Sequence, residues 1–568
     1  MSSKCITLYF CKAYNSNIGM STNDTNIRNN TNNSDLYISI VSFVLLVCHL
    51  YVGIVAIAQP VIAKGAPDVA NDFFQKKNFP SAIKCYQFLL KKDPESIEYN
   101  HKIAQCYLRS NSIKAKAISH LKLIIKKEKY PDEVWLDLGM AYHFSNKFDD
   151  AIKTYNKFKE KQKDKEEIKK TDHLIEQCIN GKELVKRPLN VSFENLGRGI
   201  NSEFPDFYPI ISVDGSNLFF TTRRKSPAAQ QPEFDGLYPS DIFSIQMKNG
   251  KWSKPQVLGN IINTLLDEQV VDVSDDGTIL LFYIDHIDIF GDIWIARRLN
   301  NKAQWLKPEP LPENINAGME TSASVYKNPL TEEEMLVVAS SRPGTADNLN
   351  FGETDIYISR RLPTGSWSEP KNLGTNINTK YKEEFPQFSE DGKTLYFASQ
   401  GHSSMGGFDL FKSVYDETNQ TWSPPENLGY PINTADDDLN ISFTSRGRLA
   451  YLSTMREGGQ GDLDIYRVVL EDIEAKETIY KGYITSTDTL RKIKKAKIEI
   501  INKKTSKQHG LYLPDPNSGY YIISLSPGKW TMKIEADGYI PYAEDINIFD
   551  EVLKFSPETT KNIKLKKK

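Results

Sequence analysis

The chain has 568 residues, of which 39% are hydrophobic and 25% are charged, and its formal net charge is -2. This length predicts several domains, and the hydrophobic share excludes a polytopic membrane protein, a collagen-like chain and wholesale disorder. The near-neutral charge gives no global basic character of the kind that binds nucleic acid, and six cysteines are too few for a disulfide framework.

The N-terminal segment predicts export. Residues 36–58 contain no Asp, Glu, Lys or Arg, and they end in Ala56-Ile57-Ala58 after a polar leader. An apolar run closed by small residues is typical of a secretory signal, so residues 1–58 are interpreted as a leader and a signal peptide cleaved after Ala58. The run is also long enough to span a bilayer, so an uncleaved anchor is the alternative, and Met20 is an alternative start.

Residues 66–187 show a helical repeat. Small residues recur at intervals of 34 and 35 residues, at Ala70, Ala104 and Gly139. The third unit reads Trp-x2-Leu-Gly-x2-Tyr from Trp135 and resembles the tetratricopeptide repeat, whose period is about 34 residues. That resemblance implies a stack of paired helices whose groove binds a partner, with a mere spacer as the alternative. The cysteines of this block are predicted to be buried free thiols: Cys85, Cys106 and Cys178.

A different repeat occupies residues 191–472. An Asp-aliphatic-aromatic tripeptide recurs five times, beginning at Asp241, Asp292, Asp355, Asp409 and Asp464. Four of the five are followed by Trp-x-x-Pro, by Leu-Gly or a near variant, and then by Ile-Asn. Units of about 50 residues with several short strands predict a β-propeller of five blades, or six if the degenerate flanks form one more.

The regular spacing within these units favours a structural role for each recurrent residue. The Asp is predicted to orient a hairpin through hydrogen bonds to the backbone, and the Trp to pack between blades. Residues before Leu196 are predicted to supply a strand that closes the ring. The units resemble the WD-type, TolB-like propeller repeats of bacterial envelope proteins. The propeller is acidic between two basic flanking segments, which favours solubility or a basic partner.

Residues 478–568 alternate apolar and polar side chains in short runs. A Gly-x-Tyr strand at Gly519, a Leu-x-Pro-Gly turn at Leu525 and a closing Gly-Tyr at Gly538 resemble the carboxypeptidase regulatory-like, transthyretin-like β-sandwich. The resemblance implies a folding and docking module without catalytic residues.

A search for reactive groups leaves no catalytic, cofactor-binding or metal-binding residue. His286 between Asp285 and Asp288 suggests a ligand cluster, but its place before a repeat tripeptide favours a blade loop. Residues 401–406 lack the G-x-S-x-G spacing of a nucleophile elbow, and residues 458–461 lack the helix that a phosphate loop needs. The prediction is therefore that the chain is not an enzyme.

The order of the modules resembles Gram-negative envelope proteins that end in an OmpA-like peptidoglycan-binding domain, some of which belong to the type nine secretion and gliding apparatus. This chain stops at Lys568, where that domain would begin. The resemblance implies a periplasmic, outer-membrane-associated scaffold that binds outer-membrane or secretion-apparatus proteins and reaches peptidoglycan only indirectly. Membrane contact is expected only if the N-terminal segment stays uncleaved. The alternative function is a propeller-based sensor of a glycan or another small ligand.

Overall fold

A computed structural model describes residues 67–568, except for residues 112, 213–214, 249–250, 287–288, 329–330, 332, 346–347, 391, 445–446, 457, 474–477, 489–490, 494, 516–517 and 549–557. The predicted leader and signal segment, residues 1–58, lies outside the described residues. Within the described part of the chain, no helix is long and apolar enough to cross a bilayer.

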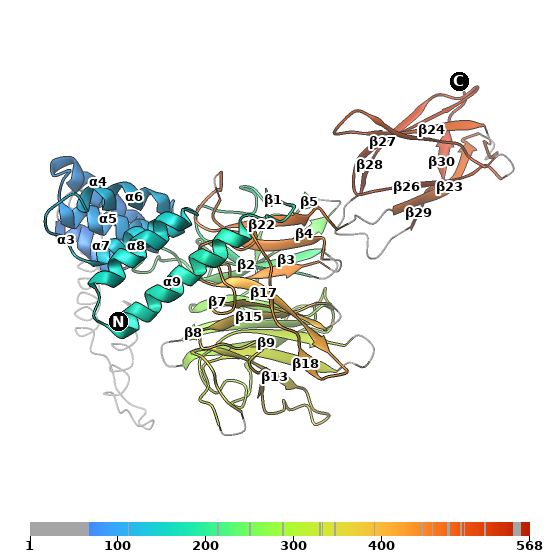
Figure 1. Ribbon diagram of the computed structural model, residues 1–568. Helices are drawn as coiled ribbons and strands as arrows, with labels where there is room; N and C mark the ends of the chain where they lie inside the picture. The colour runs from blue at the N-terminus through green and yellow to red at the C-terminus, as the bar shows by residue number, and fades with distance from the viewer. Residues whose placement is uncertain are drawn as a thin grey trace, which may run out of the picture. The chain divides into compact units, whose positions relative to one another are not determined.

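The N-terminal part of the described chain is a block of helices (Figure 1). Its elements are α3 (Pro67–Gln75), α4 (Phe79–Lys92), α5 (Ile97–Arg109), the short 3-10 helix η1 (Lys114–Lys116), α6 (Ala117–Ile124), α7 (Glu133–His143), α8 (Phe148–Lys161) and α9 (Lys165–Leu184). Each α-helix packs against the next one along the chain. The recurring small residue Gly139 of α7 lies directly against the ring of Tyr155 of α8, because an added Cβ would lie 2.5 Å from that ring.

The three cysteines of this block are buried free thiols, as predicted. Burial raises the thiol pKa of Cys106 and of Cys178 to about 12, so both stay protonated and unreactive at neutral pH. The assignment of the block to tetratricopeptide repeats stays a prediction.

The chain then forms a propeller-like region of antiparallel sheets. Among the described residues, five sheets lie between residues 191 and 470. The first sheet contains β2 (Asp206–Ile211), β3 (Asn217–Thr222), β4 (Asp241–Lys248), β5 (Lys251–Trp252) and β6 (Gln256–Val257), and the second contains β7 (Asp267–Val273), β8 (Ile279–His286), β9 (Ile289–Arg297) and β10 (Glu309–Pro310). The third sheet contains β11 (Glu320–Lys327), β12 (Glu334–Ser340), β13 (Asp355–Arg360) and β14 (Lys371–Asn372), and the fourth contains β15 (Glu383–Phe388), β16 (Thr394–Ser399), β17 (Asp409–Asp416), β18 (Thr421–Trp422) and β19 (Glu426–Asn427). The fifth sheet contains β20 (Ile441–Phe443), β21 (Leu449–Thr454), β22 (Asp464–Leu470) and β1 (Val191–Asn195).

The strand predicted before Leu196 is present. It is β1, which pairs antiparallel with β22 from Val191 opposite Leu470 to Asn195 opposite Tyr466. The fifth sheet therefore contains strands from both ends of the propeller-like region. It also shares an apolar cluster with the first sheet, in which Phe220 and Tyr451 are both fully buried. These contacts tie the last repeat to the first.

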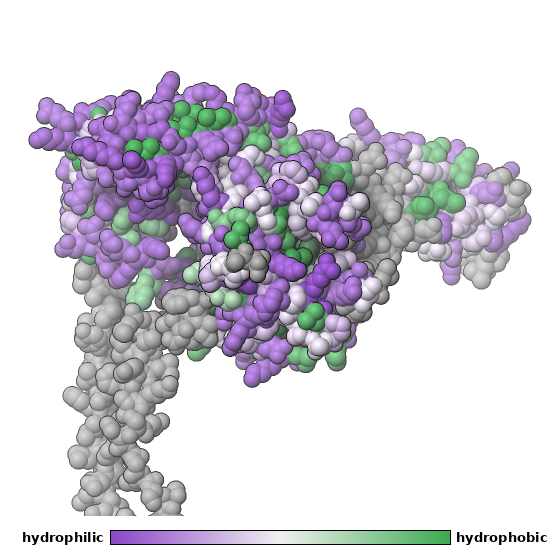
Figure 2. All heavy atoms as spheres, turned by 60° about the horizontal axis from the view of Figure 1, so that its bottom comes forward, coloured by the Kyte–Doolittle hydropathy of each residue, from purple (hydrophilic) through white to green (hydrophobic). Residues whose placement is uncertain are grey.

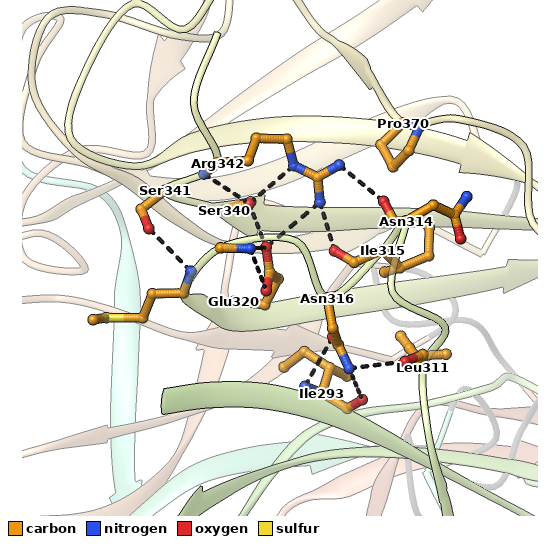
Figure 3. Close-up of polar contacts among 12 residues, drawn as sticks. Ile293, Leu311, Asn314, Ile315, Asn316, Glu320, Ser340, Ser341, Arg342 and Pro370 are labelled. Carbon is orange, nitrogen blue, oxygen red and sulfur yellow. Dashed lines mark hydrogen bonds and ion pairs between the residues drawn. The ribbon is translucent and has the colours of Figure 1, made fainter. Parts of the chain in front are cut away.

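The recurrent Ile-Asn pair joins each sheet to the connection that leads into the next one. In all five repeats the Asn side-chain oxygen accepts the backbone N–H of the aliphatic residue in the Asp-aliphatic-aromatic tripeptide, and its amide nitrogen donates to the carbonyl of that same residue. We call this contact the asparagine clamp; Figure 3 shows it between Asn316 and Ile293. The pairs are Asn201 with Ile465, Asn263 with Ile242, Asn316 with Ile293, Asn378 with Ile356 and Asn433 with Leu410.

The recurrent Asp and Trp take the predicted structural roles. Asp355 accepts the backbone N–H groups of Phe351 and Gly352 at 2.7 and 3.0 Å, and Asp409 and Asp464 make the corresponding bonds. The Trp side chains lie in clusters that combine residues of neighbouring sheets: Trp252, Trp305, Trp367 and Trp422. Three of the repeats are thus fixed internally by the Asp, and four are packed against a neighbouring sheet through the Trp.

Residues 478–568 form two sheets with one shared core. One sheet contains β23 (Thr478–Ser486), β26 (Tyr520–Leu525), β29 (Glu558–Thr560) and β30 (Ile563–Leu565), and the other contains β24 (Ala496–Asn502), β25 (Gln508–Tyr512), β27 (Gly528–Ala536) and β28 (Tyr542–Ile548). Buried side chains of both sheets meet in the core, including Ile484 and Tyr521 from the first and Ile498 and Met532 from the second.

Replacing one clamp asparagine should destabilise the propeller-like region strongly. In Asn378→Ala the buried backbone N–H of Ile356 loses its partner at 2.7 Å, whereas the Ile356 carbonyl keeps the backbone N–H of Leu373 at 3.1 Å. An unsatisfied buried group costs about 1–3 kcal/mol, so we expect a loss of about 1–3 kcal/mol in the free energy of unfolding measured with denaturant. The control Asn419→Ala removes an exposed asparagine from the turn between β17 and β18 and should change it by less than about 0.5 kcal/mol. Equal losses in the two variants would contradict the clamp.

Candidate ligand site in the central cavity

The first strands of the five sheets surround a cavity of about 340 Å³. Its polar wall consists of residues at matching positions of four of these strands: Asp272, Ser324, Gln387 and Ser442. Aromatic side chains also line the cavity: Tyr326, Phe388, Tyr396 and Phe443. A cavity of this size that combines aromatic side chains with convergent polar groups is a candidate ligand site.

Hydrogen bonds between neighbouring sheets hold the polar wall in place. In three cases the wall residue accepts a backbone N–H from the following sheet: Val325 N to Asp272 Oδ2 at 2.8 Å, Phe388 N to Ser324 Oγ at 3.2 Å and Ile211 N to Ser442 Oγ at 3.0 Å. Gln387 instead donates from Nε2 to Ser442 Oγ at 3.2 Å. These side chains are therefore oriented before any ligand arrives, which lowers the entropic cost of binding.

Two groups of the wall are strong acceptors. Asp272 is 4% exposed. Burial raises the pKa of Asp272 to about 7, although hydrogen bonds from Ser324 and from the Val325 backbone act in the opposite direction. The buried Oε1 of Gln387 has no hydrogen-bond partner among the described protein atoms. A buried acceptor without a partner is costly, so this oxygen is suited to a donor group of a ligand.

Two aromatic rings meet beside the cavity. Tyr208 of β2 and Phe385 of β15 approach to 4.7 Å between ring centroids, and they come from sheets that are not neighbours around the ring. Both residues occupy the left-handed backbone region, with φ of 50° and 51°, at irregularities in their strands. A bulky residue pays roughly 1–3 kcal/mol for that conformation, so the surrounding packing must enforce it. The paired rings therefore bring the first and fourth sheets into direct contact.

The first strands also begin with buried carboxylates. In the third sheet Glu320 lies 3.5 Å from Arg342, whose guanidinium donates to Ser340 Oγ and to the carbonyls of Asn314 and Ile315 (Figure 3). Asp206 of the first sheet pairs in the same way with Arg224. These ion pairs fix the beginning of a first strand to the end of the second strand of the same sheet.

The second and fourth sheets have no arginine at the corresponding sequence position, where the chain has His286 and Gly401. Burial there raises the pKa of Glu268 to about 8 and that of Glu383 to about 7. Hydrogen bonds from Thr264 lower the pKa of Glu268, and hydrogen bonds from Thr379 and Ser399 lower the pKa of Glu383. In both cases the effect of burial is larger.

Residues 401–406 are a loop before the fourth tripeptide, as the sequence suggested, and the loop contacts the helices. Four helical side chains hold it: His143 Nε2 to Met405 O at 2.8 Å, Asn180 Nδ2 to Ser404 O at 3.0 Å, His173 Nε2 to Gln400 O at 3.0 Å and Gln177 Nε2 to Ser404 Oγ at 3.3 Å. Met405 is fully buried in the core cluster of the helices. The helical block thus contacts main-chain carbonyls of an irregular loop and buries a methionine anchor.

Of the other residues considered from the sequence, residues 458–461 lie in the connection before β22, and His286 ends a strand. Residues 458–461 precede β22, and the N–H groups of Gln460 and Gly461 donate to Asp464. His286 ends β8, whereas its side chain and Asp288 lie outside the described residues.

The sequence analysis missed all four residues of the polar wall. They lie on separate strands more than fifty residues apart, so no local motif unites them. A signal was present, because each stands four residues after the acidic residue at the start of its repeat: Glu268 and Asp272, Glu320 and Ser324, Glu383 and Gln387, Asp438 and Ser442.

No family model and no curated protein matches this chain. Among solved structures it is similar to TolB from Acinetobacter baumannii, at 16% identity and a TM-score of 0.27 over 47% of this chain and 54% of that chain. It therefore spans about half the length of that TolB chain. The RRP9 WD40 repeats match at 9% identity and a TM-score of 0.26 over 49% of this chain and 97% of that one. Sucrose-6-phosphate hydrolase from Lactobacillus gasseri matches at 11% identity and a TM-score of 0.32 over 66% of this chain and 91% of that one.

The prediction that the chain is not an enzyme is corrected by these matches. A hydrolase stands among the chains of similar fold, beside TolB and a WD40 protein. The prediction relied on missing local motifs, but a propeller-like fold brings together side chains from separate strands, and such a site leaves no compact motif. The same fold hosts different functions, and at these identities and TM-scores the similarity assigns none of them to this chain.

Removing the ionisable group of Glu268 should flatten the pH dependence of stability. Burial raises the pKa of this carboxyl from 4.5 to about 8, so the protonated form stabilises the fold below about pH 4.5 and this contribution is lost as the pH rises through about 8. We expect Glu268→Gln to raise the free energy of unfolding at pH 8.5 by roughly 2 kcal/mol relative to the wild type, with little change at pH 4.5. Denaturant titrations at both pH values measure this difference.

The exposed Glu313→Gln variant is the control and should follow the wild-type profile. An unchanged slope in Glu268→Gln would show that this carboxyl titrates normally.

Proposed function

We propose that the chain is a scaffold of the bacterial cell envelope that binds partner proteins. In this proposal residues 66–187 are tetratricopeptide-like repeats, residues 191–472 a five-bladed propeller and residues 478–568 a regulatory-like sandwich. The partners are outer-membrane or secretion-apparatus proteins in the periplasm, and peptidoglycan is reached only through them. The location and the class of partner rest on the resemblance of the module order to envelope proteins.

An apolar hollow on the second sheet carries the proposal. It has a volume of about 510 Å³, and its wall includes Ile262, Leu266, Phe282, Ile284, Trp294 and Pro308. Ile261 at its edge is 46% exposed. On the face that Figure 2 shows, hydrophilic side chains predominate and hydrophobic ones gather in small patches. An apolar hollow of this size on such a surface marks a protein-interaction site.

Charge indicates what occupies the hollow. Asp292 and Lys307 both line it, and Asp267 and Asp285 lie near Tyr283 of the same sheet, because burial and these three carboxylates raise the pKa of Tyr283 to about 12. The propeller-like region as a whole is acidic. A partner segment with an apolar anchor side chain and flanking Lys or Arg residues therefore fits this surface best.

The contacts of the loop at residues 400–405 support the scaffold independently. The helical side chains bind its carbonyls and bury its methionine, so the helices hold a protein segment through main-chain and apolar contacts. Because the chain's own loop takes these contacts, the hollow of the second sheet is the better candidate for an outside partner.

A photoreactive residue at position 261 should cross-link to a distinct partner in the cell envelope. The matched control is position 299, where Leu299 is 86% exposed in the same sheet but does not line the hollow. We expect cross-linked bands of defined mass at position 261 alone, and a loss of at least tenfold in the affinity of that partner for Ile261→Asp. Equal cross-linking at both positions, or none at 261, would argue against a docking site.

A second function is favoured by a separate observation, the central cavity. Its polar wall is held by hydrogen bonds, its outer lining is aromatic, and its volume of about 340 Å³ suits a small ligand. This second candidate function is the binding of a glycan or another small ligand.

A further inference from the structure

We propose that the central cavity binds a primary ammonium group, carried either by a lysine side chain of a partner protein or by a free amine. The inference rests on the second candidate function and specifies the ligand class for that cavity. It does not depend on the apolar hollow of the second sheet.

The polar wall offers acceptors that a neutral ligand would satisfy less well. Asp272 supplies a carboxylate whose Oδ2 already accepts from Val325 N, so its geometry is fixed. Gln387 supplies Oε1, which is buried and has no partner among the described protein atoms. An ammonium group has three N–H donors and no acceptor, so it can satisfy both oxygens at once.

The aromatic lining strengthens this preference. Tyr396 and Phe443 stack at 4.6 Å between ring centroids, and Tyr326 and Phe388 approach to 6.0 Å. All four residues line the cavity. Aromatic faces attract cations, and they also bury the methylene groups of an alkyl-ammonium stem.

The charge of the described lining disfavours an anionic ligand. Asp275 and Glu390 line the cavity together with Asp272, and none of the described residues that line it is Lys or Arg. A carboxylate or phosphate would therefore meet repulsion from these three carboxyl groups.

Ionisation of Asp272 adds a pH signature. Burial raises its pKa to about 7, so the carboxylate becomes fully charged only as the pH passes that value. The pKa of an alkylammonium group lies near that of lysine, about 10.4, so the ligand stays charged between pH 6 and 8. Ammonium binding should therefore strengthen over this interval.

The test uses calorimetry and ligand-detected NMR on the chain, with N-acetylglucosamine as a glycan probe and four further probes. These are pentylammonium, pentan-1-ol as its neutral isostere, a short peptide with one lysine, and the same peptide with that lysine acetylated. We expect pentylammonium to bind at least tenfold more tightly than pentan-1-ol, with an affinity that increases from pH 6 to pH 8. Tighter binding of the lysine peptide than of pentylammonium would assign the ammonium to a partner protein, and the reverse order to a free amine.

Two variants separate the site from the fold. Asp272→Asn keeps an oxygen for Val325 N and removes the charge, so pentylammonium binding should weaken at least tenfold with little change in Tm. Gln387→Glu adds a second carboxylate at the unpartnered acceptor and should strengthen the binding. The control Asp276→Asn removes a carboxylate that pairs with Lys327 and does not line the cavity, and it should leave binding unchanged.

Three results would overturn the proposal: equal affinity for pentylammonium and pentan-1-ol, equal weakening by Asp272→Asn and Asp276→Asn, or binding of N-acetylglucosamine without binding of any ammonium probe. The last result would retain the second candidate function with a glycan as ligand. Failure of every small molecule to bind would instead reject that function altogether, while cross-linking at position 261 would still test the scaffold.

Discussion

One asparagine amide in each repeat holds the propeller-like region together. Its oxygen and nitrogen bind the N–H and carbonyl of a single buried residue, for example Ile356 with Asn378 at 2.7 and 2.9 Å. The clamp sits where the chain leaves one sheet for the next, so it sets the position of the following first strand. Everything that the first strands carry, including the polar wall of the cavity, depends on that placement.

The same placement explains how the cavity is organised without any local motif. Asp272, Ser324 and Ser442 each accept a backbone N–H from the following sheet, so each repeat orients the wall residue of its neighbour. The buried carboxylates at the beginnings of the first strands differ in their partners. Arg342 compensates Glu320, whereas Glu268 accepts hydrogen bonds from the hydroxyl and the backbone N–H of Thr264. The repeats share a backbone plan and differ in their charge.

The two surfaces proposed as functional differ in chemistry. The hollow beside Trp294 is apolar and lies on the surface of one sheet, which suits a protein segment. The central cavity combines acceptors with aromatic rings and lies between sheets, which suits a small cationic group. The helices bind the loop around Met405 through a hydrogen bond to its carbonyl and through burial of its side chain. A scaffold binds partner segments through contacts of the same two kinds.

The sequence by itself determined the repeat units, the strand before Leu196, the hairpin role of residues such as Asp355 and the buried thiols, because each depends on local spacing and periodicity. It missed the cavity and misjudged the possibility of an enzyme. Asp272 and Gln387 lie 115 positions apart, and only the closing of the sheets into a circle brings them to one wall. Tertiary structure alone decided this, since side chains from distant strands meet through packing that no local pattern encodes.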